Sequence, residues 1–335
     1  MHIVRAGGIE GFSELVRSMG KNPGRLLEQV GLEAAALRDP DAYLPYEKVA
    51  ELFRVAADHC DDELFGIKLS APQGRRTLGL LGLFISSQPT IGAAMAFAGR
   101  YTHFHASGVR LTQTDMGSFS VIELSFDLPE RIGLEQLRQH AVGLLSRLLA
   151  RMAPPSWRPL KILLRQREPS VGRGEMERFF GCPVSFESEL DGLMLENAIL
   201  RQPPAVSTEQ MRKLLDEHVR TMESNYPGNL VDQAAHIVGT LLPLSECSLE
   251  AVARLLDLHP RVLQQRLAAQ GTTYQRILDE TRLDIARQHL QYTRTPLTDL
   301  ALNLGFAELA VFSRAFRRWT GTSPSAWRKA HSSPA

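Results

Sequence analysis

The sequence has little cysteine and no long apolar run. Its three cysteines, Cys60, Cys182 and Cys247, stand singly, which excludes a disulfide framework and a zinc motif of paired cysteines. No segment approaches the roughly 18 uncharged apolar residues of a membrane-spanning helix, and residues 1–20 lack the apolar core of a secretory signal. We therefore expect a cytoplasmic protein with no membrane partner.

Net charge is also scarce, and it is unevenly distributed. The 335 residues sum to +1, and 44% hydrophobic and 22% charged residues are typical of a globular chain of two or three domains. From Ser248 onward, 12 Lys and Arg stand against 7 Asp and Glu, so this part carries +5 and the rest −4. The asymmetry indicates a nucleic-acid-binding end attached to a neutral or acidic domain.

The basic part contains an internal repeat. Apolar residues after Ser248 match those after Pro296 at a constant offset, and the match resumes after one inserted residue. The matching residues are Leu249, Val252, Ala253, Leu256, Leu258, Leu263 and Leu267 against Leu297, Leu300, Ala301, Leu304, Phe306, Phe312 and Phe316. Each copy predicts two short amphipathic helices joined by a tight break, which is the helix-turn-helix pattern.

Local signals support the breaks in this repeat. Ser248 is predicted to cap the first helix, and Thr295 to cap a later one with Pro296 at its first position. Pro260 suits the first turn of a helix, and Gly305 suits a left-handed turn. Residues 272–293 predict a connecting helix, which would set two reading heads roughly 30 Å apart, close to one turn of DNA.

The stretch from Gly305 to Gly321 combines aromatic residues with arginines. Helical spacing places Phe312, Phe316 and Trp319 on one stripe, which must be buried, with Leu309 at its border. The opposite arc carries Ala310, Ser313, Arg314, Arg317 and Arg318. Such an arc fits a polyanion, and by itself it fits a solvated face equally well.

Residues Pro227 to Lys329 closely resemble the DNA-binding domain of the AraC/XylS family of bacterial transcription regulators. The most specific part is "LTDLALNLGFAELAVFSRAFRRWTGTSPSAWR". In the first copy, Asp257 stands where glycine is more usual and Gln265 where arginine is frequent. The resemblance implies base contacts from two recognition helices, by Arg261, Gln264 and Gln265 and by Leu309, Ala310, Ser313 and Arg314, and phosphate contacts by Arg282, Arg317 and Arg318.

Side-chain chemistry agrees with several of these assignments. Glutamine can pair with adenine, arginine with guanine and serine with either, while Ala or Leu can meet a thymine methyl group. Contacts to phosphates position a protein without reading sequence.

The first 200 residues predict an α+β domain, with helices on a small antiparallel sheet. Helical patterns occupy 11–20, 45–60, 77–88, 90–107 and 134–152, and strand patterns occupy 108–115, 118–127, 159–168 and 182–196. The apolar stripe on 134–152 is more often internal core than a subunit interface. Gly79 and Gly82 fit no phosphate loop and indicate close helix packing, in a place that would suit a pocket.

This part resembles the arabinose-binding-type effector domain of one branch of the same family. The segments "LPYEKVAELFRVAAD", "LGLLGLFISSQPTIGAAMAFAGRY" and "FFGCPVSFESELDGLMLENAILRQPP" carry the resemblance. It implies that the domain senses a small molecule, and the label is no argument for arabinose.

Together these features predict an effector-sensing and dimerisation domain (1–205), a linker helix (206–226) and a DNA-binding domain of two helix-turn-helix units (227–330). The predicted function is a ligand-responsive transcription activator acting as a homodimer. Its expected partners are double-stranded promoter DNA, a small-molecule effector and RNA polymerase. No metal or cofactor is predicted, because His103 and His105 have no third ligand at a metal-site spacing.

Two alternatives remain open. Some DNA-repair methyltransferases join an AraC-type tail to an alkyl-accepting cysteine, a role that would fall to Cys182. Pro183 and Val184 follow it, however, where such enzymes have His and Arg. The other alternative is a scaffold whose N-terminal domain only dimerises, which predicts no thermal shift with any small molecule.

Overall fold

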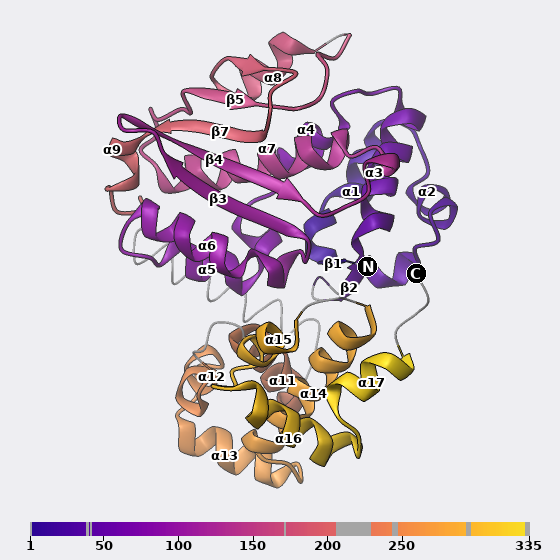
Figure 1. Ribbon diagram of the computed structural model, residues 1–335, viewed down its shortest axis with the longest axis vertical. Coiled ribbons are helices and arrows are strands. Elements are labelled where there is room, and N and C mark those ends of the chain that lie inside the picture. Colours follow the sequence, from indigo (N-terminus) through magenta and orange to yellow (C-terminus); the bar gives the residue numbers. More distant parts are fainter. Residues whose placement is uncertain are drawn as a thin grey trace. The chain divides into compact units, whose positions relative to one another are not determined.

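The computed structural model describes residues 2–37, 40, 42–170, 172–205, 229–242, 247–292 and 296–331. The chain forms two compact units, one containing the described residues up to 205 and the other those from 229 onward (Figure 1). The predicted architecture of an N-terminal unit with sheets and a helical C-terminal unit is confirmed. The predicted linker helix at 206–226 lies outside the described residues.

The N-terminal unit is built on a five-stranded sheet of order β3-β4-β7-β5-β6. Its strands are β3 (Val109–Asp115), β4 (Phe119–Phe126), β5 (Lys161–Leu163), β6 (Val184–Ser185) and β7 (Asp191–Glu196). All pairs are antiparallel except β5 and β6, which pair in parallel. The expectation of an antiparallel sheet is wrong for that pair, because α8 (Arg173–Phe180) connects the two strands as a crossover.

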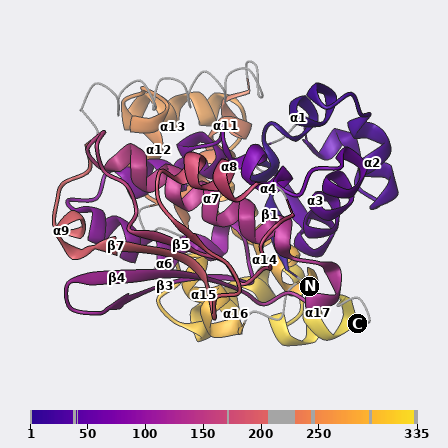
Figure 2. The same ribbon diagram turned by 90° about the horizontal axis from the view of Figure 1, so that it is seen from above.

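The helices predicted for this unit form near the expected positions. They are α1 (Phe12–Ser18), α3 (Tyr46–Cys60), α5 (Leu80–Ser86), α6 (Ile91–His105) and α7 (Glu135–Met152). Helix α6 packs along β3, and α7 packs against α3, α4 (Phe65–Ser70) and β7 (Figure 2). On α7, Leu137, Leu145, Leu148 and Met152 are buried, so the predicted apolar stripe is internal.

Several short elements were not predicted. They are β1 (Ile3–Arg5), β2 (Tyr43–Pro45), α2 (Pro23–Gln29), α4 (Phe65–Ser70), α9 (Asn197–Leu200) and the 3-10 turns η1 (Ala6–Ile9), η2 (Ala34–Leu37), η3 (Arg75–Leu78) and η4 (Glu130–Ile132). Strands β1 and β2 form a separate antiparallel pair. Each element is too short to show a clear hydrophobic period.

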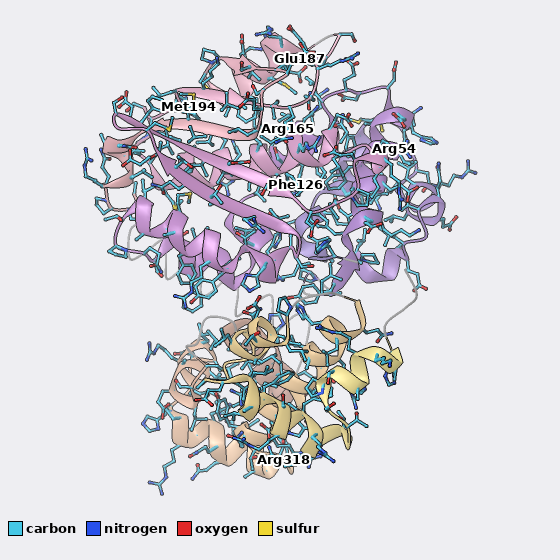
Figure 3. The ribbon with its side chains drawn as sticks, in the orientation of Figure 1. Arg54, Phe126, Arg165, Glu187, Met194 and Arg318 are labelled. Atoms are coloured by element: carbon cyan, nitrogen blue, oxygen red, sulfur yellow. The ribbon has the colours of Figure 1, made fainter. Side chains whose placement is uncertain are left out.

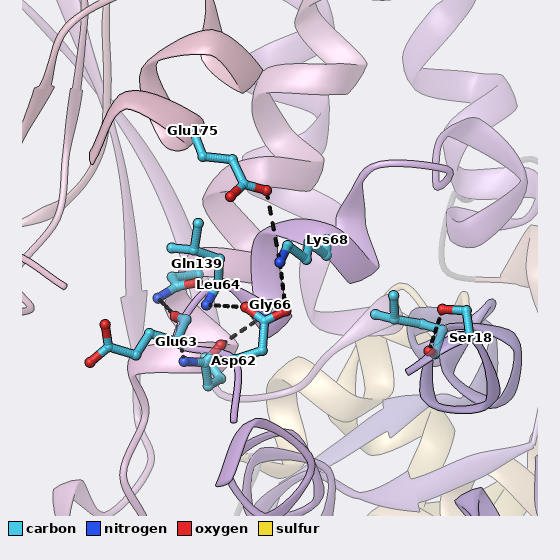
Figure 4. Close-up of polar contacts among 10 residues, drawn as sticks. Ser18, Asp62, Glu63, Leu64, Gly66, Lys68, Gln139 and Glu175 are labelled. Atoms are coloured by element: carbon cyan, nitrogen blue, oxygen red, sulfur yellow. Dashed lines mark hydrogen bonds and ion pairs between the residues drawn. The ribbon is translucent and has the colours of Figure 1, made fainter. Parts of the chain in front are cut away.

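Helices α4 and α7 approach closely at Gly66. A Cβ atom at this position would lie 2.1 Å from the Gln136 carbonyl oxygen, so only glycine fits there. The Gly66 N–H donates to Gln136 Oε1 at 2.8 Å, and the Nε2 groups of Gln136 and Gln139 each donate to the Glu63 carbonyl at 2.9 Å (Figure 4). These buried amides fix α7 against α4.

The C-terminal unit contains two helix pairs arranged around α14 (Tyr274–Tyr292). The first pair is α12 (Leu249–Leu255) and α13 (Pro260–Ala269), and the second is α15 (Leu297–Asn303) and α16 (Leu309–Thr320); α11 (Leu230–Leu241) and α17 (Pro324–His331) complete the unit. The predicted connecting helix is α14, which at 19 residues is about 28 Å long.

The sequence repeat is also a repeat in burial and backbone geometry. Leu263 and Leu267 are fully buried on α13, and their counterparts Phe312 and Phe316 are fully buried on α16. Within each pair, the same backbone bond closes the turn, from Leu258 N to Ala253 O at 2.9 Å and from Phe306 N to Ala301 O at 3.0 Å. The two pairs therefore have one local design.

The predicted caps are confirmed in part. Ser248 Oγ accepts from Ala251 N at 3.1 Å, Pro260 opens α13, and Gly305 has the left-handed φ of 71°. Pro296 occupies the N-cap of α15 and not its first helical position, because its backbone is extended. Thr295 lies outside the described residues.

Candidate nucleic-acid interface and effector cavity

Helix α13 presents a polar outer face. The His259 ring accepts from Arg261 N at 3.3 Å, and Pro260 then leads into the helix. Because Leu263 and Leu267 bury the inner face, Arg261, Gln264 and Gln265 are exposed on the other side. These three predicted base-contacting side chains thus lie together on one accessible surface.

Helix α16 has the same division between an inner and an outer face. Phe312 and Phe316 join a buried cluster with Ala286 and Leu290 of α14, and Trp319 packs against it. On the outside, Ala310, Arg314, Arg317 and Arg318 are exposed and Ser313 is half-buried. Leu309, predicted to meet a base, packs against the cluster, so part of its surface is already covered.

The arginines of these faces differ in their partners. Within the described part of the chain, no carboxylate lies within ion-pair distance of Arg261, Arg314 or Arg317. Arg318, at the end of α16 (Figure 3), lies 3.2 Å from Asp279 Oδ2 on α14. Arg261, Arg314 and Arg317, which have no described carboxylate partner, are available to an anionic ligand. To contact such a ligand, Arg318 would first have to leave its exposed ion pair with Asp279.

Arg282 of α14 contacts the turn between α15 and α16, which the sequence did not reveal. Its Nε donates to the Leu304 carbonyl at 2.9 Å, an Nη donates to the Gly305 carbonyl at 3.4 Å, and the guanidinium lies 4.4 Å from the centre of the Phe306 ring. It thus braces the turn between α15 and α16. A phosphate contact by Arg282 stays a prediction.

The N-terminal unit contains a mainly apolar cavity of about 100 Å³. Its walls come from several elements and include Phe53 of α3, Leu81 and Ile85 of α5, Met95 of α6, Leu111 of β3 and Leu144 of α7. Leu78 and Leu81 line it beside Gly79 and Gly82, in agreement with the predicted pocket near these glycines. The cavity is therefore the candidate effector site.

Two buried histidines also line this cavity. Burial, together with the nearby Arg5 and His140, lowers the pKa of His105 to about 3, and burial lowers the pKa of His140 to about 4. Both imidazoles are therefore neutral near pH 7. His140 Nε2 lies 2.6 Å from Gln73 Oε1, and because Gln73 Nε2 donates to the Glu10 carbonyl at 2.7 Å, the histidine must be the donor.

The geometry at Cys182 does not support an alkyl acceptor. The side chain is buried, and burial raises the pKa of its thiol to about 11, so little thiolate forms near pH 7. Among the described residues, no group of three or more His, Cys, Asp or Glu could hold a metal ion. No described helix is both long and apolar enough to cross a membrane.

The sequence assigned Arg282 to a phosphate contact but did not reveal its contacts with the turn between α15 and α16, nor that His105 and His140 line the cavity. The sequence excluded His105 from a metal site and assigned it no other role, because "HFH" carries no sign of the strands and helices that close around it. For the role of Arg282 in the turn no local signal existed, because the Leu304 and Gly305 carbonyl groups that it contacts lie more than 20 residues away in the sequence.

Comparisons with known proteins agree with both parts. The family described as "Arabinose-binding domain of AraC transcription regulator, N-term" matches residues 20–204, and "Helix-turn-helix domain" matches residues 252–330. The HTH-type transcriptional regulator VirS of Mycobacterium tuberculosis is 23% identical over 328 residues, covering 97% of this chain and 96% of its own.

Two further proteins are similar over most of the chain. The ornithine utilization regulator of Pseudomonas aeruginosa is 24% identical, covering 96% of this chain and 95% of its own. The solved structure of the transcriptional regulator CdpR from Pseudomonas aeruginosa is 21% identical with a TM-score of 0.41, covering 92% of this chain and 96% of that one. Because the first family model spans more than half of the sequence and the second the basic repeat, the chain belongs to the AraC/XylS family of DNA-binding transcription regulators, with an arabinose-binding-type effector domain.

Proposed function

We propose that this chain is a cytoplasmic, homodimeric transcription activator whose binding to promoter DNA depends on a small molecule held in the N-terminal cavity. In this proposal residues 1–205 sense the effector and dimerise, 206–226 form a linker helix, and 227–330 bind DNA through two helix-turn-helix units.

The repeated turn is the observation that carries the DNA-binding part of the proposal. It places α13 and α16 after equivalent left-handed residues, Asp257 and Gly305, with their apolar faces buried and their polar faces free. Two helices with this design, joined by an α14 of about 28 Å, fit successive major grooves of one duplex.

The proposed base contacts are those of the outer faces. They are Arg261, Gln264 and Gln265 on α13 and Leu309, Ala310, Ser313 and Arg314 on α16, with Arg282, Arg317 and Arg318 on phosphates. The accessible Arg261, Arg314 and Arg317 are the best supported of these, since they combine exposure with the absence of a described carboxylate partner.

The proposed regulation is a shift between two populations. An effector that binds one arrangement of the protein more tightly increases the share of that arrangement, and the DNA affinity changes with it. In the favoured arrangement, two protomers engage the promoter and assist RNA polymerase.

The test is a selection of genomic DNA fragments by the purified full-length protein at two salt concentrations. Recovery of a motif with paired elements about one helical turn apart supports a specific regulator. Fragments without a motif, bound with an affinity that collapses as salt rises, would mean that the basic face binds only phosphates.

A further inference from the structure

The wall of the N-terminal cavity carries a distinctive chemistry. Aliphatic and aromatic side chains make up most of it, and no Asp, Glu, Lys or Arg is among the described side chains that line it. A charged ligand would lose its hydration there without gaining a partner of opposite charge. The cavity therefore selects against ions.

Two polar side chains of this wall already form hydrogen bonds with other described residues. The Thr102 hydroxyl donates to the Ala98 carbonyl at 2.6 Å, and His140 Nε2 donates to Gln73 Oε1. His105 differs, because it is only 8% exposed and no hydrogen bond joins its ring to another described residue. An unpaired buried nitrogen is costly, so a ligand that pairs with it gains affinity.

We propose that the effector is an uncharged, mainly apolar molecule of about single-ring size, whose one hydrogen-bonding group pairs with the imidazole of His105. This inference rests on the proposed function, since it names the effector class for the same cavity. The size follows from the cavity of about 100 Å³, which is comparable with the apolar cavity of roughly 150 Å³ that takes up benzene.

The same wall disfavours a sugar, although the family description names arabinose. A pentose carries a hydroxyl or ring oxygen on every carbon, and each of these groups needs a partner when it leaves water. The described lining offers too few polar groups for that number.

Four probes test this chemistry on the full-length protein at pH 7.5, by calorimetry and by NMR of the histidine rings. Benzyl alcohol has a ring and one hydroxyl, toluene has the ring alone, benzoate adds a charge, and L-arabinose is a polyol. We expect benzyl alcohol and toluene to bind and to shift the His105 signals, and benzoate and L-arabinose to bind at least tenfold more weakly.

His105→Leu isolates the hydrogen bond. This variant should lower the affinity for benzyl alcohol by about three- to tenfold and leave the affinity for toluene unchanged, because only the alcohol loses a hydrogen-bond partner. His59→Leu is the matched control, since the His59 ring bonds to its own helix at the Val55 carbonyl and does not line the cavity. If His105→Leu does not fold, Ala141→Leu is the substitute variant, because it narrows the cavity. We expect it to lower the affinities for benzyl alcohol and toluene together.

The ligand class is overturned if L-arabinose or benzoate binds as tightly as benzyl alcohol, or if His105→Leu leaves the ratio of benzyl alcohol to toluene affinity unchanged. The proposed function fails in a different way. A fragment selection without a motif overturns the regulator, while probe binding still decides the ligand class.

Discussion

At the residue scale, one backbone position separates the two copies of the repeat. Asp257 has φ of 51° and Gly305 has φ of 71°, so both are left-handed at the end of the first helix of a pair. Glycine adopts this conformation without cost, whereas an L residue with a side chain is strained by roughly 1–2 kcal/mol, somewhat less for Asp. The first copy thus retains strain that the second avoids.

Substitutions at Asp257 and Gly305 should reveal the backbone strain at this position. We expect Asp257→Gly to raise the free energy of unfolding by up to about 1 kcal/mol, since the relief of strain is partly offset by the greater freedom of glycine in the unfolded chain. Gly305→Ala should lower it by about 1–2 kcal/mol. Urea unfolding followed by circular dichroism measures both, and a loss of stability on Asp257→Gly would contradict this account.

Variants of the exposed arginines of α16 should distinguish sequence-specific base contacts from non-specific binding to phosphates. Arg314→Ala is expected to relax base preference and to cost about 1–3 kcal/mol of specific binding, because a bidentate base contact is lost. Arg318→Ala should weaken binding to all sequences and reduce the salt dependence.

The measurement is the affinity for the selected DNA and for a scrambled sequence at several salt concentrations. Arg54→Ala serves as a charge control, since Arg54 forms a surface pair with Asp58 in the N-terminal unit (Figure 3). Unchanged discrimination by Arg314→Ala would show that α16 faces DNA differently from our assignment.

At the scale of elements, α16 is held from two sides. Its aromatic residues pack into the cluster with Ala286 and Leu290, and Arg282 of α14 fixes the turn that precedes it. This explains why aromatic residues and arginines occur together in α16, because the aromatic residues hold the helix against the cluster and the arginines leave its outer face cationic.

Replacing Arg282 should therefore lower the stability of the fold more than it changes electrostatic binding to DNA. We expect Arg282→Ala to lower the free energy of unfolding by about 1–3 kcal/mol, because two carbonyl groups lose a charged donor. Arg276→Ala, which breaks only an exposed pair with Glu280, should cost less than about 0.5 kcal/mol. A salt slope reduced by about one, with stability unchanged, would instead identify Arg282 as a phosphate contact.

At the scale of the whole molecule, the buried histidines link stability to pH. In the unfolded chain they take up protons below about pH 6.5, whereas in the folded chain His140 does so near pH 4 and His105 near pH 3. The unfolded state therefore binds more protons between these values. Stability is complete above pH 6.5 and declines as the pH falls.

The expected decline steepens as the pH falls below 6.5 and approaches about 1.4 kcal/mol per pH unit for each histidine near pH 5. Urea titrations of the full-length protein at several pH values measure it, in a window where most carboxyl groups remain ionised. His105→Leu should reduce the slope near pH 5 by up to about 1.4 kcal/mol per pH unit, whereas a slope equal to that of the wild type would show that His105 does not remain neutral in the folded state.

The sequence alone determined the local design of this protein. The repeat, its capping residues and the apolar stripes predicted α1, α3, α5, α6 and α7 and the helices from α12 to α16, because each signal depends on neighbours a few residues apart. The resemblance in the last helices likewise identified the family.

Only the tertiary structure decided the cavity, the neutral histidines and the role of Arg282. Each depends on groups far apart in the chain, as when residues from β1 to α7 close one apolar space around His105. Burial sets the pKa of a histidine and the partners of an arginine, and burial follows from how the elements pack together, which no local pattern encodes.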